Sequence, residues 1–410
     1  MTEQLRFIGS LKHWLVPLVF VLTSYSYSLG EEGVFQEWTS IDGRVLEGRI
    51  VFRDGDSVRI ERKDGREFLI PLDRFIEEDR ERMRLWVPPE IMVPEPDNAV
   101  LVLETPTGRG SGFLVQEMGR VWVYTNQHVI GDAVNLNAFD INGEQVPLGD
   151  LELAVDRDLA RFVTTVERGL KLAESGKTGD AIRVFGNSQG TGVITRDDGE
   201  ILGISPLTIE VSSEIVSGNS GGPVLNEEGE AIGVSAFVKF GEYSSDATME
   251  DTRYEKPRRF ALRLDREIDF RKVSRDEFVE TYKVFNNSTA VFDEGVALTS
   301  QILGDPFTRV MVGTIDSKEL AEVAEDHNKD VAKFSALNYS GMPYRSKMKR
   351  VSGRLVDTLE DALGVCEESL KTAQFLFRDE RFGWMSSELD RRQELLDRLK
   401  EVVVEVEDSF

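Results

Sequence analysis

The segment VSGNSGGPVLN, residues 216–226, sets glycines, two serines and a proline between apolar runs. Three kinds of site use such a segment: an interdomain linker, a phosphate-binding loop, or a loop that presents a nucleophile. A linker is disfavoured because the flanking apolar runs are typical of buried strands. A phosphate loop leads into a helix and usually carries a lysine, whereas PVLNEEGEAIGVSAF is typical of strand, turn and strand. The segment is therefore interpreted as a nucleophile loop that presents Ser220.

Ser220 needs a base, because a serine hydroxyl is a weak nucleophile at neutral pH. The stretch 218–222 fits G-x-S-x-G, the elbow of α/β-hydrolases, but that fold requires a helix after the serine and a histidine further along. The histidine downstream is His327, which lies in a charged helical segment. The other solution places the base before the serine, and His128 in VYTNQHVIGDA is the one histidine of the β-rich region.

A catalytic imidazole also needs a carboxylate on its second nitrogen, which holds the tautomer and stabilises the imidazolium that forms. Thirty residues after His128, the segment AVDRDLARF offers Asp158 directly before a Leu-Ala pair, with Asp156 as the alternative. The order His128, Asp158, Ser220 within one β-rich region predicts a catalytic triad. Such a triad works without a cofactor and without a metal ion.

These residues resemble the trypsin/chymotrypsin-like serine peptidases, and most closely the HtrA (Do-like) type. The resemblance covers residues 99–265 and rests on GSGFLV, TNQHV, DRDLA and GNSGGP. It implies a double β-barrel that cleaves polypeptide substrates through an acyl-enzyme. Carried over by position, Ser220 is the nucleophile, His128 the general acid and base, and Asp158 the residue that orients His128. The N–H groups of Gly218 and Ser220 would form the oxyanion hole.

The same resemblance suggests where substrate specificity is set. Glu214, six residues before the nucleophile, would lie at the base of the primary specificity pocket, where a carboxylate selects Lys or Arg side chains. The alternative is that Glu214 faces solvent on its strand. The segment from Ser235 to Phe237 would line the pocket wall, and Phe237 would narrow it.

The chain is predicted to be multidomain, with an all-β double-barrel (chymotrypsin-like) protease core, a small β-barrel module before it and an α-helical C-terminal region after it. The apolar stretch of the N-terminus is about nine residues long, much shorter than the roughly twenty of a spanning helix, and is typical of a secretory signal peptide. The predicted segments are a signal peptide at 1–30, the module at 31–87, a Pro-rich linker at 88–98, the protease at 99–265 and the helical region at 266–410.

The segment 31–87 resembles the SLA-one homology domain, a small module appended to bacterial surface and secreted proteins. The residues that carry the resemblance are Trp38-Thr39-Ser40, Asp42-Gly43-Arg44, Pro71-Leu72 and Asp79-Arg80. The resemblance implies binding or tethering to a protein or envelope partner, without chemistry of its own.

The C-terminal region departs from HtrA-type proteases, which normally carry PDZ domains after the protease. Its helical periods predict no PDZ domain, so neither PDZ-based activation nor trimer assembly is expected. An apolar stripe in the last helix is interpreted as packing on its own domain, with an oligomerising coil as the alternative. The stripe consists of Leu389, Leu395, Leu396, Leu399 and Val403.

Composition limits the partners and the compartment. A formal net charge of −25 argues against nucleic acid as a partner, because phosphate backbones are bound through clustered Lys and Arg. The single cysteine, Cys366, excludes an internal disulfide and is interpreted as a core residue. An exported protein of the bacterial periplasm, envelope or exterior is predicted. The sequence leaves open a second function, a catalytically silent protease fold that acts as a binding or scaffold protein.

Overall fold

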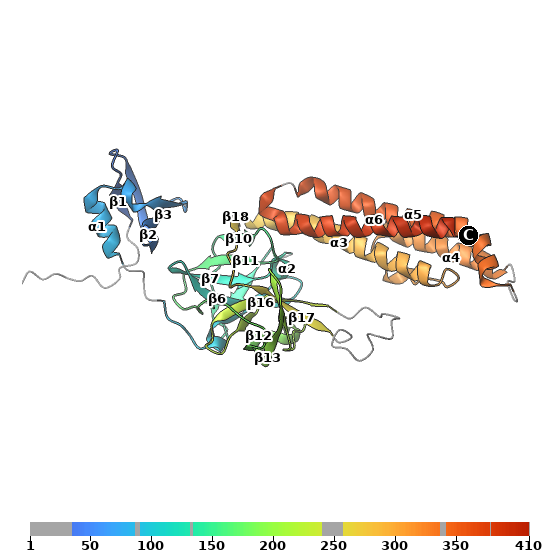
Figure 1. Cartoon of the computed structure of the whole chain (residues 1–410), viewed down its shortest axis with the longest axis horizontal. Coiled ribbons are helices and arrows are strands. Elements are labelled where there is room, and N and C mark those ends of the chain that lie inside the picture. Colours follow the sequence, from blue (N-terminus) through green and yellow to red (C-terminus); the bar gives the residue numbers. More distant parts are fainter. Residues whose placement is uncertain are drawn as a thin grey trace, which may run out of the picture. The chain divides into compact units, whose positions relative to one another are not determined.

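The computed structural model of the chain describes residues 35–86, 91–131, 134–239, 257–336, 342–377 and 379–409. The chain divides into two compact units, Met1–Pro89 and Glu90–Phe410, which Figure 1 shows as ribbons. The predicted signal peptide lies outside the described residues. Among the helices of the described ranges, none combines the length and the apolar character needed to cross a membrane.

The N-terminal unit is an antiparallel sheet in the order β1-β2-β3-β4. Two of its hairpins turn at Asp-Gly pairs: Ser57 N donates to Asp54 Oδ1 at 2.8 Å, and Gly65, which follows Asp64, has a φ of 75°, which favours glycine. The sheet stays open, whereas the sequence predicts a small barrel. The elements are β1 (Gln36–Thr39), β2 (Val45–Asp54), β3 (Ser57–Glu61), β4 (Glu67–Pro71), the 3₁₀ helix η1 (Leu72–Arg74) and α1 (Glu77–Leu85).

Two of the residues that carry the resemblance of this unit hold it together. Trp38 is buried, and its Nε1 donates to the carbonyl of Gly48 at 2.8 Å. The buried carboxylate of Asp79 accepts from Thr39 N at 2.6 Å and pairs with Arg82 at 2.6 Å. Their roles are structural, and the resemblance to the SLA-one homology domain stays a prediction.

The β-rich part of the second unit holds the predicted protease core and is called the peptidase part after that prediction. It begins with an eight-stranded antiparallel sheet in the order β18-β10-β11-β7-β6-β5-β8-β9. Its elements are η2 (Pro96–Ala99), β5 (Val100–Glu104), β6 (Arg109–Glu117), β7 (Arg120–Thr125), the short helix α2 (Gln127–Ile130), β8 (Asn137–Phe139), β9 (Gln145–Val146), β10 (Leu151–Ala154), β11 (Ala160–Thr164) and β18 (Phe270–Val273).

Residues on both sides of the predicted protease segment 99–265 pair with this part of the structure. The strand β18 lies beyond Asp265 and pairs with β10, so that Leu151 faces Val273. Before residue 99, Met92 N donates to the carbonyl of Glu167 at 3.1 Å, and Gly169 N donates to the carbonyl of Met92 at 3.0 Å. The described part of the predicted linker is therefore paired with the peptidase part.

The second half of the peptidase part is a closed six-stranded barrel in the order β12-β13-β14-β17-β16-β15. One eight-stranded sheet followed by one closed barrel matches the predicted double-barrel core. The elements are β12 (Ala181–Gly186), η3 (Ser188–Gly190), β13 (Thr195–Ile204), β14 (Thr208–Val211), β15 (Pro223–Leu225), β16 (Ala231–Lys239) and β17 (Arg258–Arg263).

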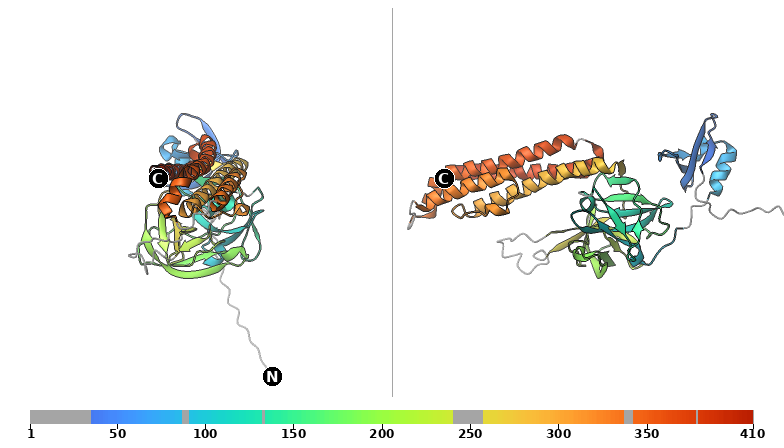
Figure 2. Two further views of the ribbon diagram at one scale, coloured as in Figure 1. Left: turned by 90° about the vertical axis from the view of Figure 1, so that its right-hand side faces the viewer. Right: turned by 180° about the vertical axis from the view of Figure 1, so that it is seen from behind.

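The C-terminal region is helical as predicted, and its long helices run side by side in Figures 1 and 2. The side chain of Ser274 caps the first helix by accepting from Glu277 N at 3.2 Å. The elements are α3 (Arg275–Gly304), η5 (Val312–Thr314), α4 (Lys318–Ala336), α5 (Tyr344–Leu376), η6 (Glu380–Phe382) and α6 (Gly383–Asp408).

The apolar stripe of α6 packs inside this bundle, since Leu389, Leu396 and Val403 are all buried. Cys366 is also fully buried, and burial raises the pKa of its thiol to about 11. A thiol with that pKa is neutral and unreactive at physiological pH, in agreement with a core residue.

The helices and the eight-stranded sheet share one hydrophobic core. The side chains of Phe278 and Phe285 on α3 belong to the same buried cluster as Leu151 on β10 and Phe162 on β11. A hydrogen bond also joins the two, because Arg275 Nη2 on α3 donates to the backbone carbonyl of Leu148 at 2.5 Å. The closed barrel encloses a second cluster, while other side chains of its strands, such as Phe185 and Leu225, join the shared core. Asp265 therefore does not separate two independently packed domains.

Candidate active site

His128 lies on α2, the single helical turn that follows β7. Its Nδ1 lies 2.5 Å from Asp158 Oδ2, and its backbone N–H donates to Asp158 Oδ1 at 3.0 Å. Both carboxylate oxygens of Asp158 are thus occupied by one residue. This arrangement fixes the imidazole so that its Nε2 is available to a nucleophile.

The residues just before His128 hold the loop that carries Asp158. Asn126 Nδ2 donates to the carbonyl of Asp158 at 2.8 Å, and Gln127 Nε2 donates to the carbonyls of Ala154 and Arg157 at 3.0 and 3.1 Å. Base and carboxylate are therefore positioned by the same short segment of chain.

The alternative acid, Asp156, points elsewhere. Its carboxylate pairs with the guanidinium of Arg157 at 2.7 Å, and its side chain is 45% exposed. The structure brings Asp158 to the imidazole and leaves Asp156 at the surface.

The pKa of His128 reflects two opposing effects. Burial by itself disfavours the imidazolium and lowers the pKa, but the negative charge of Asp158 and its hydrogen bond outweigh burial. The pKa of His128 is therefore raised above its ordinary value. An imidazole in this setting is a stronger base than a free one, as a proton acceptor for serine requires.

The nucleophile loop between β14 and β15 requires its glycines. Gly218 and Gly221 have φ angles of 92° and 86°, which side-chain-bearing residues rarely adopt. A Cβ on Gly218 would lie 2.1 Å from the carbonyl oxygen of Asn187, and one on Gly221 would lie 2.0 Å from that of Ser111. The glycines thus allow the loop to pass directly against neighbouring backbone.

Ser111 on β6 ties this loop to the eight-stranded sheet. Its N–H donates to the carbonyl of Ser220 at 3.0 Å, and its Oγ donates to the carbonyl of Gly218 at 2.7 Å. The same Oγ accepts from Asn187 N at 2.8 Å. Because both carbonyls point to Ser111, the peptide groups of the loop are held in one orientation.

A hollow of about 300 Å³ is lined by two of the three predicted triad residues, His128 and Ser220, and we call it the Ser220 hollow. His128, Gly218 and Ser220 all line it. Ser220 Oγ donates to the carbonyl of Ala236 at 3.3 Å in this conformation. Within the described part of the chain, the N–H groups of Gly218 and Ser220 donate to no protein acceptor. Two free donors beside a hydroxyl make a site that can bind an oxyanion.

The predicted specificity residues lie outside the lining of the Ser220 hollow. The side chain of Glu214 is 73% exposed and pairs with Arg259 at 3.6 Å, which agrees with the solvent-facing alternative. Ser235 is buried on β16, and Phe237 stacks on Phe260 with ring centroids 5.1 Å apart. Contact of these three side chains with a substrate remains a prediction.

Sequence reasoning assigned no role to three residues that the structure brings to the site. Ser111 stands between two glycines in a strand, a pattern that indicates close backbone approach and could have been noticed. Tyr282 and Asn286 on α3 line the Ser220 hollow. Nothing in their helical segment distinguishes them from ordinary core and surface residues.

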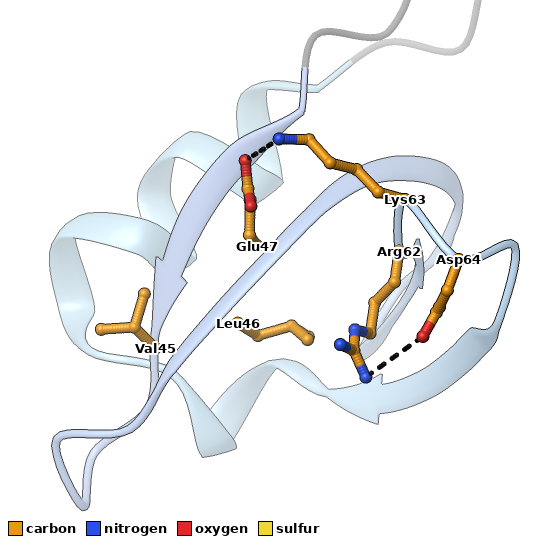
Figure 3. A pocket seen from close by; sticks show the side chains of 6 residues that line it. All are labelled: Val45, Leu46, Glu47, Arg62, Lys63 and Asp64. Atoms are coloured by element: carbon orange, nitrogen blue, oxygen red, sulfur yellow. Dashed lines mark hydrogen bonds and ion pairs between the residues drawn. The ribbon is translucent and has the colours of Figure 1, made fainter.

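A second hollow, of about 500 Å³, lies in the N-terminal unit, and Figure 3 shows its lining. Lys63 Nζ pairs with Glu47 Oε1 at 2.5 Å, and Arg62 pairs with Asp64 at 3.6 Å. These charges compensate one another, so this hollow offers no group poised for chemistry. Across the described ranges, no cluster of His, Cys, Asp and Glu side chains is arranged to hold a metal ion.

Comparison with known proteins identifies the peptidase part. Residues 110–234 match the trypsin-like peptidase domain family. The probable periplasmic serine endoprotease DegP-like of Chlamydia pneumoniae is 32% identical over 146 residues, which are 32% of this chain and 29% of that protein. The serine protease Do-like HtrA of Bacillus subtilis is 27% identical over 154 residues, which are 33% and 34% of the two chains.

Among solved structures, the serine endoprotease from Yersinia pestis matches with 22% identity and a TM-score of 0.32, over 41% of this chain and 59% of that one. The chain spans about a third of the length of the curated relatives that it matches. The matched family segment falls inside the predicted protease core. The resemblance to trypsin-like peptidases with HtrA-type homologues is therefore confirmed, and the absence of PDZ domains stays a prediction.

Proposed function

We propose that the chain is an exported serine endopeptidase that cleaves polypeptides through Ser220, His128 and Asp158. The observation that carries the proposal is the pairing of His128 with Asp158 at 2.5 Å in the hollow that Ser220 also lines. The relatives are named serine proteases, which supports the same reaction class.

In the proposed reaction, Ser220 Oγ first turns from the carbonyl of Ala236 to His128 Nε2, a rotation between staggered side-chain positions. His128 takes the hydroxyl proton while Oγ attacks the carbonyl carbon of the scissile peptide. The resulting oxyanion accepts hydrogen bonds from Gly218 N and Ser220 N.

Collapse of this tetrahedral intermediate expels the amine, which takes its proton from His128 and leaves an acyl-enzyme on Ser220. Water then attacks the ester, with His128 again removing a proton. Asp158 stays ionised throughout and stabilises the imidazolium.

Export is the second part of the proposal. The charged and apolar pattern of residues 1–30 supports it, as does the word periplasmic in the name of the relative from Chlamydia pneumoniae. The N-terminal unit would then bind a protein or envelope partner. The buried stripe of α6 gives no reason to assign oligomerisation to the helical region.

The deciding experiment is labelling of the purified full-length protein with a fluorophosphonate, which reacts with activated serines. We expect labelling of the natural chain and none of Ser220→Ala, with a loss of peptidase activity on the order of a million-fold. Ser212→Ala is the matched control, since Ser212 is an exposed serine whose Oγ accepts from Glu200 N at 2.9 Å.

Folding of each variant is checked by circular dichroism. A folded natural chain that stays unlabelled between about pH 6 and pH 9 would support the alternative of a silent binding protein, because that range covers protonation of the catalytic histidine.

A further inference from the structure

The helix α3 packs directly beside the residue proposed as the catalytic base. Gly131 follows the turn that carries His128, and a Cβ at Gly131 would lie 2.1 Å from the ring of Tyr282. Tyr282 is itself buried, with the rings of Phe278 and Phe285 both 5.7 Å away. The close approach of Tyr282 to Gly131 places this turn of α3 against the site, and the two neighbouring rings of the same helix hold the Tyr282 ring in position.

The next turn of α3 presents Asn286. Residues four apart share one face of a helix, and both Tyr282 and Asn286 line the Ser220 hollow. Tyr282 is 8% exposed, whereas Asn286 is exposed. Another part of the lining comes from the hairpin that joins β5 and β6, including Thr105 and Arg109. A helix from outside the two barrels thus completes the cleft.

The hollow lies on one side of the nucleophile. Ser220 Oγ faces the carbonyl of Ala236 on β16, yet Ser235 and Phe237 of that strand do not line the hollow. The resemblance to trypsin-like peptidases implies that Ser235 to Phe237 of β16 line the pocket for the residue before the scissile bond. The part of the substrate that leaves with the amine is then expected to run through the hollow along α3.

We infer that Tyr282 and Asn286 select the residues of the substrate that follow the scissile bond. The ring of Tyr282 limits depth, and the side-chain amide of Asn286 offers two donors and one acceptor to an extended peptide backbone. The substrate class is a polypeptide with small residues directly after the cleaved bond. This inference rests on the proposed peptidase function.

The lining charges agree with this class. The charged or titratable side chains of the lining are His128, Arg109 and Tyr282, none of them a carboxylate, and Arg109 is paired with Glu104 at 2.6 Å. The hollow therefore offers no unpaired carboxylate that would favour a basic residue after the scissile bond.

The test uses the full chain and internally quenched peptides that share the residues before the scissile bond and differ in the two residues after it. Each peptide is scored by cleavage and by how far it slows fluorophosphonate labelling of Ser220, so that binding is measured even without turnover. The variants are Asn286→Trp, which places a bulky ring in the hollow, and Asn286→Ala, which removes the side-chain amide. The neighbouring Asn287→Ala is the matched control, because Asn287 is exposed on α3 but lies outside the lining.

We expect Asn286→Trp to lower kcat/KM at least tenfold more for peptides with bulky residues after the bond than for those with glycine. Asn286→Ala should weaken all the peptides several-fold while Asn287→Ala changes none by more than about twofold. A peptide preference of Asn286→Trp that matches that of the natural chain within twofold, together with kcat/KM values of Asn286→Ala within twofold of the natural ones, would overturn the inference. If the natural chain itself is not labelled, the peptidase proposal fails instead, so the two failures are distinguishable.

Discussion

The two halves of the peptidase part differ in what supports them. The closed barrel presents Ser220 and encloses its own hydrophobic cluster. The eight-stranded sheet carries His128 and Asp158, yet its cluster continues into α3, α5 and α6. The candidate nucleophile thus lies in a half that has a core of its own besides the side chains, such as Phe185 and Leu225, that it adds to the shared core. The candidate base and its carboxylate lie in a half whose core continues into the helices. The comparison teaches that the helical region belongs to the packing framework of the candidate site.

The largest effect is expected from shortening the chain. A chain that ends at Asp265 loses β18 and the aromatic side chains of α3, and it leaves the apolar surface around Phe162 and Leu151 exposed. Burial of one such aromatic side chain is worth about 3–5 kcal/mol, comparable to a large part of a domain's stability. We expect a chain without a cooperative thermal transition and without fluorophosphonate labelling.

The matched control begins at Glu90 and removes the N-terminal unit, which encloses its own small core. That chain should unfold cooperatively and label at the natural rate. A folded and active chain ending at Asp265 would contradict the shared-core comparison.

The next largest effect concerns the carboxylate. Asp158→Asn removes the charge that holds the imidazole, and we expect kcat to fall about 10⁴-fold, as the loss of this group typically costs. The pKa of His128 is raised by Asp158 against the effect of burial, so activity rises with pH through that raised pKa. With the charge gone and burial retained, the acidic limb of kcat/KM should move to lower pH.

If the acidic limb of kcat/KM lies at the same pH in Asp158→Asn as in the natural chain, a group other than His128 determines that limb. Asp156→Asn serves as the control, because its partner is Arg157 and its side chain is 45% exposed. Both kcat and the limb should stay near those of the natural chain.

A smaller effect is expected in the closed barrel. Gly218→Ala places a Cβ about 2 Å from the carbonyl oxygen of Asn187 at a φ of 92°, which turns the peptide group of the oxyanion hole. We expect kcat to fall roughly 10²- to 10³-fold, the usual cost of one lost donor.

Gly203→Ala tests the same barrel without strain, since its Cβ would make an ordinary 3.7 Å contact with Glu210. Thermal unfolding and kcat of both variants are compared. Equal losses in the two would mean that general destabilisation, rather than the oxyanion hole, explains the effect.

The smallest effect is expected for Glu214→Gln. Because the side chain of Glu214 is 73% exposed and its ion pair with Arg259 spans 3.6 Å, solvent screens its charge. We expect the ratio of kcat/KM for Lys or Arg to that for Leu before the scissile bond to change less than about threefold. A tenfold loss would place Glu214 in the specificity pocket after all.

The sequence predicted the part of the site that depends on residue type and chain order. A serine among glycines, a histidine before it and a carboxylate near the histidine are readable because each type has a fixed chemical task. The pairing of His128 with Asp158 at 2.5 Å agrees with that prediction. The double-barrel class could be predicted as well, since short strands and glycine turns recur along 99–265.

The contribution of α3 could not be predicted, because it depends on packing between distant segments. In the sequence, Tyr282 is one apolar position of an amphipathic helix. Its contact with Gly131 is found only in the folded structure. For the same reason β18 was assigned to the helical region, although its pairing with β10 makes it a sheet strand. The position of a domain boundary is decided by tertiary contacts, which local periodicity does not encode.

Ser111 also bears on how such enzymes can be recombined. Its two hydrogen bonds to the carbonyls of Gly218 and Ser220 run between segments about a hundred residues apart. A chimera that takes β6 from one parent and residues 216–222 from another would combine a strand and a loop whose hydrogen bonds to each other do not match. Gene-shuffling schemes should therefore inherit the two stretches as a single block, however far apart their codons lie.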